Sequence, residues 1–320
     1  MSYMTDADRL GSSGTDERRR WSIILAGGNG NRLSEFTRLF YDHDRPKQYC
    51  AFVGTRSMLQ HTYDRTVQMT DPKRIITIVS GRHLPFVREQ LRGDADRSVL
   101  VQPYCRETAA SILLGLSTIQ HQDPTSVTAI FPSDHFILDE RKFAQYVRSA
   151  TEYTEQHPEK LVLLGVRPDR EDHGYGCIEI GEQDRTAERY PLYTVRSFAE
   201  KPARSLSGEY LWNTFVIIGR TGTLMQTILR CIPELHTAFD RYRRVHGRQE
   251  SWHALNALYE RIPSINFSSA VLEKVPSRLC VMDISDVGWN DWGEAHRIHE
   301  DVFRYDLRLN GAVPVETEAA

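Results

Sequence analysis

The sequence predicts an α/β protein built on a doubly wound, mostly parallel sheet. Up to about residue 170, short apolar segments rich in β-branched residues alternate with segments of helical periodicity, and the joins between them are short. This alternation is typical of a parallel sheet covered by helices on both faces. The first apolar segment, SIILAGG at 22–28, ends in glycines, as a buried strand that opens into a loop would.

The other elements follow in chain order. Helices are expected at 57–69, 83–91, 108–120 and 141–156, and strands at 74–80, 98–103, 126–135 and 160–166. Beyond about residue 170 the pattern changes to β-rich segments at 174–181 and 193–202, a strand at 211–219 and two helical stretches. The change predicts a mixed α/β extension packed on the same core, without a separate second domain.

Length and composition are those of an ordinary globular protein. The 320 residues are 40% hydrophobic and 26% charged, which is enough to bury a sizeable core. The net charge of -3 gives no electrostatic reason to expect nucleic acid or a membrane surface as a partner. We expect a mobile polar tail at 1–20, a single domain at 21–305 and a C-terminal tail at 306–320.

Cysteine usage and hydropathy favour a cytoplasmic protein. The five cysteines are scattered without a Cys-x-x-Cys pair, which argues against a disulfide framework or a zinc site. No apolar run is long enough to span a bilayer, and the first twenty residues lack the apolar region of a secretory signal.

The glycine-rich loop after the first strand is a candidate anion site. Gly27, Gly28 and Gly30 would let backbone N–H groups approach an anion closely, and Arg32 adds a permanent charge that can pair with phosphate oxygens. The spacing matches neither a dinucleotide-binding fingerprint nor a P-loop. A tight turn followed by a surface arginine explains this loop about as well when the loop is considered alone.

Charged residues recur where later strands end. Lys47 lies in DRPKQY, Asp134 in FPSDH, Glu200 and Lys201 in FAEKP, and Asp291 in VGWNDWG. Each has an ordinary explanation, because aspartates cap helices and brace turns and most lysines are solvated. Ligands of open α/β sheets bind beyond the carboxyl ends of the strands, so the joint occurrence favours a phosphate site with a carboxylate-bound divalent cation.

Seven short motifs carry a family resemblance: LAGGNGNR, RPKQ, PSDH, FAEKP, LWNT, AVLEK and GWNDWG. In this order they resemble the sugar-1-phosphate nucleotidyltransferase family, and the branch they are most similar to is that of the mannose-1-phosphate guanylyltransferases, also called GDP-mannose pyrophosphorylases. The resemblance extends from residue 21 to about 298. It implies a Rossmann-like sheet of the nucleotide-diphospho-sugar transferase type.

The resemblance also implies a reaction and a set of site residues. The reaction joins a sugar-1-phosphate to an NTP, with GTP favoured, and releases pyrophosphate; Mg²⁺ is the implied cofactor and a homodimer is possible. The implied catalytic residues are Arg32, Lys47 and Asp134, and the implied metal ligands are Asp134 and Asp291. The implied nucleotide-binding residues are Ala26, Gly27, Gly28, Gly30, Arg32, Lys47, Gln102 and Thr108. The implied sugar-phosphate-binding residues are Glu200, Lys201, Asn213 and Glu273.

This chemistry needs positive charge more than it needs a base. A sugar-phosphate oxygen is already ionised at neutral pH, and the obstacle is its approach to a polyanionic phosphorus. Two unit charges about 4 Å apart interact by roughly 4 kcal/mol at an effective dielectric constant near 20. Arg32, Lys47, Lys201 and the metal would offset several such repulsions. His135 beside Asp134 is therefore expected to be a packing or supporting residue.

Departures from the family pattern leave two alternatives open. The loop at 33–45 is longer than usual and lacks a proline, Gln102 stands where the family has glutamate, and Glu107 replaces an asparagine. A glutamine at that position also suits thymidylyl- or uridylyltransferases that act on another hexose-1-phosphate. Glu107 and the long loop keep open a homologue that binds nucleotides without catalysing transfer.

Overall fold

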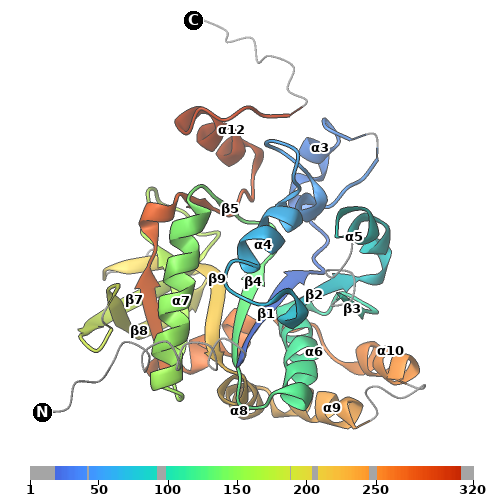
Figure 1. The fold of residues 1–320 in the computed structure, drawn as a ribbon, viewed down its shortest axis with the longest axis vertical. Helices are drawn as coiled ribbons and strands as arrows, with labels where there is room; N and C mark the ends of the chain where they lie inside the picture. The colour runs from blue at the N-terminus through green and yellow to red at the C-terminus, as the bar shows by residue number, and fades with distance from the viewer. Residues whose placement is uncertain are drawn as a thin grey trace, which may run out of the picture.

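The computed structural model describes residues 19–41, 43–91, 99–187, 189–203, 208–244 and 251–310. Within these ranges the chain forms a nine-stranded sheet in the order β3-β2-β1-β4-β9-β6-β10-β8-β7, and β7 also pairs with β9. Figure 1 shows α3 (Ser34–Thr37) and α12 (Ala295–Arg304) at one end of the molecule and α8 (Thr221–Cys231) and α9 (Pro233–Arg243) at the other.

The first half of the sheet is parallel, as predicted. It consists of β1 (Arg20–Ala26), β2 (Ile75–Ser80), β3 (Val99–Gln102) and β4 (Val127–Pro132). β1 pairs in parallel with both β2 and β4. Since all four strands run the same way, the loops that follow them emerge at one edge of the sheet.

The second half of the sheet is mixed. β9 (Tyr210–Arg220) is antiparallel and lies between β4 and β6 (Leu161–Val166). β10 (Leu279–Asp283) runs parallel to β6, and β8 (Leu192–Glu200) and β7 (Gly176–Asp184) complete the edge as antiparallel strands. The predicted α/β extension is therefore part of the same sheet. The sequence reading missed β10.

Helices cover both faces of the sheet, which confirms the doubly wound arrangement. Neighbouring residues of β1 point to opposite faces: Ile23 packs in a cluster with α6, α8, α9 and α10, whereas Ile24 packs with residues of α4 and α5. α7 covers the other strands on the second face. The bounds are α4 Met58–Thr66, α5 Leu84–Gln90, α6 Glu107–Gln122, α7 Glu140–Gln156, α8 Thr221–Cys231, α9 Pro233–Arg243 and α10 Ser251–Arg261.

Local signals explain where several helices begin. Ser57 and Gln60 form a capping box at the start of α4, in which each side chain bonds the other residue's backbone N–H. Asp139 caps α7 by accepting from the Lys142 N–H. Pro233 opens α9, where its missing N–H would have had no helical partner.

A small second sheet joins two loops that lie far apart in the sequence. β5 (Phe136–Ile137) pairs antiparallel with β11 (Trp289–Asn290). Asp134 lies just before β5, and Asp291 lies just after β11. This ribbon therefore brings the two predicted metal ligands to the same region, where α3 (Ser34–Thr37) and α12 (Ala295–Arg304) pack against each other through Phe36 and His299.

The described parts of the predicted tails are attached to the body. Arg20 belongs to β1, and its guanidinium pairs with Glu155. Leu309 forms a bridge with Val53, and the Asn310 N–H donates to the Phe52 carbonyl oxygen at 2.8 Å. The predictions for 1–18 and 311–320 fall outside the described residues. Among the residues that are described, no helix is both long and apolar enough to cross a membrane.

Candidate functional site

Two glycines of the loop after β1 are required by close approach. Gly30 has a φ of +64°, and a Cβ there would lie 2.8 Å from the backbone nitrogen of Lys47. A Cβ on Gly27 would lie 2.2 Å from Gln102 Nε2. The loop is therefore pressed against the segments that carry Lys47 and Gln102, and a larger residue at either position would push them apart.

The segment KQY at 47–49 holds the backbone of this loop by hydrogen bonds to its carbonyl groups. The Gln48 side-chain amide donates to the carbonyl oxygens of Gly28 at 2.7 Å and Ala26 at 3.2 Å. The Tyr49 hydroxyl donates to the same Ala26 oxygen at 3.0 Å. With the carbonyl groups held in this way, the loop backbone has a defined shape before any ligand arrives.

Lys47 connects the two acidic loops. Its buried ammonium group lies 3.0 Å from Asp134 Oδ2, donates to the backbone oxygen of Asp291, and lies 3.3 Å from the backbone oxygen of Trp292. Burial raises the pKa of Asp134, but Lys47, His135 and Arg32 together outweigh that effect, and the pKa of Asp134 is lowered overall. Asp134 is therefore ionised at neutral pH.

The two oxygens of Asp291 have different surroundings. Oδ1 accepts from the Tyr175 hydroxyl at 2.8 Å, from Arg297 at 2.9 Å and from the Gly293 N–H at 3.0 Å. Oδ2 lies 3.9 Å from the guanidinium of Arg32, whose side chain is largely exposed. Oδ1 is thus committed to protein donors, whereas Oδ2 faces the exposed arginine.

His135 is a buried, neutral neighbour of Asp134. Burial lowers the pKa of His135 to about 4. The indole N–H of Trp289 donates to Nδ1 at 3.2 Å, and Nε2 lies 3.9 Å from Asp134 Oδ1. An imidazole with so low a pKa is uncharged at neutral pH, which agrees with the expected supporting role.

The predicted sugar-phosphate residues meet around Gly176. β7 places Gly176 opposite Glu200 of β8, and a Cβ on Gly176 would lie 2.8 Å from Glu200 Oε2 and 3.4 Å from Asn213 Cβ. The Glu273 carboxylate accepts from the Glu200 N–H at 2.6 Å, and burial raises the pKa of Glu200. Lys201 is exposed with a φ of +50°, and its N–H donates to the Tyr175 carbonyl oxygen at 3.2 Å.

The remaining predicted residues lie at the end of β3 and the start of α6. Gln102 is buried and its amide oxygen accepts from the Ser111 hydroxyl at 2.7 Å, which directs its Nε2 toward Gly27. The Thr108 hydroxyl oxygen accepts from the Phe267 N–H at 2.8 Å, so it ties α6 to α11 (Phe267–Ala270). Glu107 is exposed and has a φ of +58°.

The structure brings the predicted residues into two groups. The first holds the glycine loop, Arg32, Lys47, Asp134 and Asp291, and the second holds Glu200, Lys201, Asn213 and Glu273. Tyr175 touches both groups and was missed by the sequence reading, although its place between Gly174 and Gly176 was a usable signal. Arg297 was also missed, because an arginine in an amphipathic helix normally indicates a solvated face.

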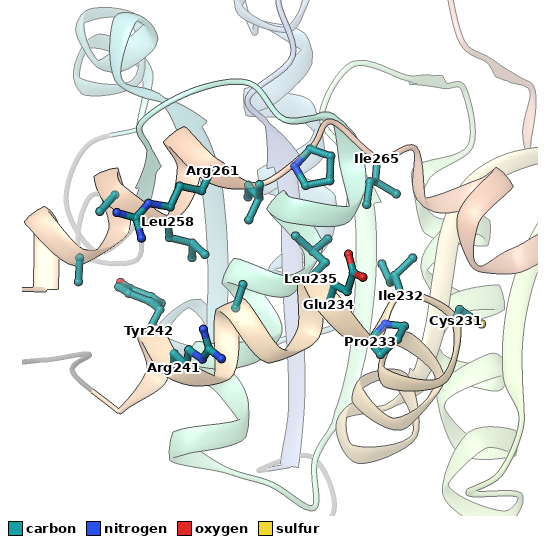
Figure 2. Close-up of a pocket in the computed structure, with 15 residues that line it drawn as sticks. Cys231, Ile232, Pro233, Glu234, Leu235, Arg241, Tyr242, Leu258, Arg261 and Ile265 are labelled. Atoms are coloured by element: carbon teal, nitrogen blue, oxygen red, sulfur yellow. The ribbon is translucent and has the colours of Figure 1, made fainter.

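A large cavity elsewhere has different chemistry. It measures about 770 Å³ and lies between α9 and α10, where Figure 2 shows Leu235, Leu258 and Ile265 around it. None of its lining residues belongs to the loops described above, and the lining is mostly apolar. Such a surface does not suit a cluster of phosphates. Among the described residues, no group of three or more His, Cys, Asp or Glu side chains is arranged to hold a metal.

Comparison with known proteins agrees with this picture. A family model described as "Nucleotidyl transferase" matches residues 21–304. The chain is 29% identical to mannose-1-phosphate guanylyltransferase of Escherichia coli K12 over 290 residues, which cover 87% of this chain and 58% of that protein. It is also 29% identical to the alginate biosynthesis protein AlgA of Pseudomonas aeruginosa, covering 85% of this chain and 56% of the relative. The chain thus spans less than two thirds of the length of these relatives.

Solved structures show the same fold. A structure described as mannose-1-phosphate geranyltransferase from Thermus thermophilus superposes with a TM-score of 0.76 at 26% identity, covering 89% of this chain and 79% of that one. A structure described as mannose-6-phosphate isomerase from Helicobacter pylori gives a TM-score of 0.66 at 16% identity, covering 85% of this chain and 99% of that one. At that level of identity the second likeness concerns the fold alone.

Proposed function

Because the chain belongs to the nucleotidyl transferase family, whose model matches residues 21–304, we propose that it makes a nucleotide sugar from a sugar-1-phosphate and an NTP. The favoured substrates are GTP and mannose-1-phosphate, which would yield GDP-mannose and pyrophosphate. This choice is supported by relatives named mannose-1-phosphate guanylyltransferase at 29% identity.

The observation that carries the proposal is the position of Lys47. Its ammonium lies between the Asp134 carboxylate and the backbone of Asp291, and its backbone nitrogen lies close to Gly30 of the loop that ends in Arg32. Loops from four separate parts of the sequence therefore place two cations and two carboxylates at one edge of the sheet. A surface helix cap or a solvated lysine would not produce this convergence.

In the proposed reaction one bond forms and one breaks. A phosphate oxygen of the sugar-1-phosphate attacks the α-phosphorus of the NTP, and the bond from that phosphorus to the oxygen bridging the β-phosphate breaks. Pyrophosphate leaves with the bonding electron pair, and no proton need move. Arg32 and Lys47 supply positive charge at the triphosphate, and Lys201 supplies it on the sugar-phosphate side.

Mg²⁺ fits the donor set as a proposed cofactor. Mg²⁺ is usually held by one or two carboxylates together with substrate phosphates and water. Asp134 is ionised, and Asp291 keeps Oδ2 directed away from its three protein donors. Asp134 and Asp291 would hold the ion, and its charge would offset negative charge on the phosphates.

A pyrophosphate-release assay tests the function. The protein is incubated with Mg²⁺, each of the common NTPs and a panel of hexose-1-phosphates. We expect release with GTP and mannose-1-phosphate above every other pair. Release with dTTP or UTP and another hexose-1-phosphate would replace the favoured substrates and keep the reaction. Nucleotide binding without release from any pair would overturn the enzyme assignment and favour a binding homologue.

A further inference from the structure

Tyr175 is the residue that connects the two groups of the site. Its hydroxyl donates to Asp291 Oδ1 at 2.8 Å, on the side of the triphosphate. Its ring stacks on Trp212 with centroids 4.5 Å apart, and its carbonyl oxygen accepts from the Lys201 N–H at 3.2 Å. The next residue, Gly176, pairs with Glu200. One side chain and its backbone thus contact both substrate regions.

Arg297 orients the Tyr175 hydroxyl. This arginine of α12 is 6% exposed, and it donates to Asp291 Oδ1, to the Tyr175 oxygen and to the Asp172 carboxylate. Its guanidinium carbon also lies 4.7 Å from the centre of the tyrosine ring. Because Arg297 can only donate, the tyrosine oxygen must accept from it, and the tyrosine proton is left to point at Asp291.

The three donors on Asp291 Oδ1 select one orientation of the carboxylate. Rotation of the carboxyl group would break the bonds from Tyr175, Arg297 and the Gly293 N–H together. Held this way, Oδ2 lies 3.9 Å from the guanidinium of Arg32, which follows the glycine loop. Three hydrogen bonds to one buried carboxylate oxygen restrict its movement, and partners of this kind tune metal-binding carboxylates.

We propose that Tyr175, held by Arg297, is a positioning residue for the transfer reaction, which sets the direction of Asp291 Oδ2 relative to the bound sugar-phosphate. The inference rests on the proposed function and deepens it. The tyrosine ring stacks on Trp212, next to the proposed sugar-phosphate residue Asn213, and the hydroxyl donates to Asp291, in the group proposed to bind the triphosphate. Removal of the hydroxyl alone should therefore affect one side and spare the other.

The test is Tyr175→Phe, with Tyr153→Phe as its matched control. Tyr153 is also buried, and its hydroxyl donates at 2.6 Å to the carboxylate of Asp184, which lies at the opposite end of β7 from Gly176. Both variants lose one tyrosine–carboxylate hydrogen bond and keep the aromatic ring. For Tyr175→Phe we expect kcat to fall about 10–100-fold, while KM for the sugar-1-phosphate changes less than about twofold. Tyr153→Phe should leave both constants within about twofold.

A binding measurement separates this inference from the proposed function. GTP is titrated calorimetrically into wild-type protein and both variants, once with Mg²⁺ and once with EDTA. We expect Tyr175→Phe to weaken GTP binding about 10-fold with Mg²⁺ and less than about twofold with EDTA. If the wild-type protein released no pyrophosphate with any pair, the proposed function would fail, yet this titration would still report on the network.

Two outcomes would overturn the inference. One is a Tyr175→Phe variant whose kcat and Mg²⁺-dependent GTP affinity stay within about twofold of wild type. The other is an equal loss in Tyr153→Phe, which would indicate a general effect of destabilisation. If thermal unfolding shows that Tyr175→Phe does not fold, Arg297→Gln is measured in its place, and the same Mg²⁺-dependent loss is expected.

Discussion

The ammonium group of Lys47 lies 3.0 Å from Asp134 Oδ2 and also donates to the main chain at Asp291. One side chain from the segment after the glycine loop therefore fastens the loops at the ends of β4 and β11. An ammonium with several fixed acceptors has little freedom to move, so its charge is already in place when phosphates bind.

Lys47→Met should remove that charge and loosen both loops. We expect kcat/KM for nucleotidyl transfer to fall about 10²–10³-fold, the range seen when one preorganised donor to a developing charge is lost. Lys142→Met is the control, because Lys142 forms an exposed pair with Asp286 at 2.7 Å and should keep wild-type activity. Pyrophosphate release gives the rates, and a Lys47→Met variant within threefold of wild type would exclude the assigned role.

Asp134→Asn and Asp291→Asn should each reduce turnover by at least about 100-fold, because both lose a charged oxygen ligand for the proposed Mg²⁺ while keeping their shape. Asp184→Asn is the control, since that carboxylate bonds Tyr153 away from the site. Rates are measured across a Mg²⁺ series, and circular dichroism checks the fold. Near-normal rates in both site variants would remove the metal assignment.

Gly30→Ala should destabilise the glycine loop. The residue has a φ of +64°, and the new methyl group would lie 2.8 Å from the Lys47 nitrogen, so strain and a clash add. We expect a loss of about 2 kcal/mol or more in unfolding free energy, together with weaker nucleotide binding. Gly28→Ala is the matched control for stability on the same loop, because nothing lies within 4 Å of its added Cβ.

Gly54→Ala separates the two causes. Gly54 has a φ of +66° but open space around it, so it reports the backbone strain alone, about 1 kcal/mol. Denaturant unfolding measures all three variants. Equal losses of unfolding free energy in Gly30→Ala and Gly54→Ala would show that the contact with Lys47 does not contribute to the cost of Gly30→Ala.

Arg65 holds the backbone next to Asp134 in place through a hydrogen bond to the carbonyl oxygen of His135. It is 3% exposed and donates to the Thr62 hydroxyl at 2.8 Å, to the His135 carbonyl oxygen at 2.9 Å and to Glu140 at 3.3 Å. Arg65→Met should cost about 2–3 kcal/mol of stability, less than for a fully buried pair because Glu140 is partly exposed. It should also lower kcat about 10-fold through movement of Asp134.

The control for Arg65 is Arg56→Met. Arg56 forms an exposed pair with Asp64 of α4, at 2.6 and 2.8 Å, and such pairs contribute little. For Arg56→Met we expect a loss of less than about 0.5 kcal/mol in unfolding free energy and no change in kcat. Denaturant unfolding measures the stability of both variants, and initial rates give their kcat. Equal losses of stability and kcat in Arg65→Met and Arg56→Met would contradict the anchoring role of Arg65.

The lowered pKa of buried His83 makes the stability of the protein depend on pH. Burial, assisted by the nearby Arg82 charge, lowers the pKa of His83 from 6.5 to about 4. The unfolded chain therefore binds the proton more readily, and the contribution of His83 to stability is complete above pH 6.5 and is lost as the pH falls toward 4. Between pH 7 and 5 the loss from this residue should be about 2 kcal/mol.

His83→Gln should flatten that dependence. Denaturant unfolding of both proteins at pH 7 and pH 5 measures the change, and the variant should lose about 2 kcal/mol less than wild type over this interval. An identical pH dependence in the two proteins would mean that His83 takes up its proton normally in the folded state.

Much of the fold could be predicted because its signals are local. β1, β2, α6 and β6 have the apolar periodicity of their class, and each was expected within a few residues of where it lies. β10 was missed, since Leu279–Asp283 is a short apolar run with no distinctive flank. Its identity as a strand depends on partners in β6 and β8, which are distant in sequence.

The amino-acid sequence alone determined the class of sheet, the family motifs and the residue types at the strand ends, because hydrophobic periodicity and glycine spacing are properties of neighbouring residues. Only the tertiary structure decided that Lys47 lies between Asp134 and Asp291, that Arg297 reaches back from α12, and that Tyr175 joins the two halves of the site. Each of these contacts joins residues brought together by the sheet and its ribbon, and long-range packing of that kind leaves no periodic trace in the sequence.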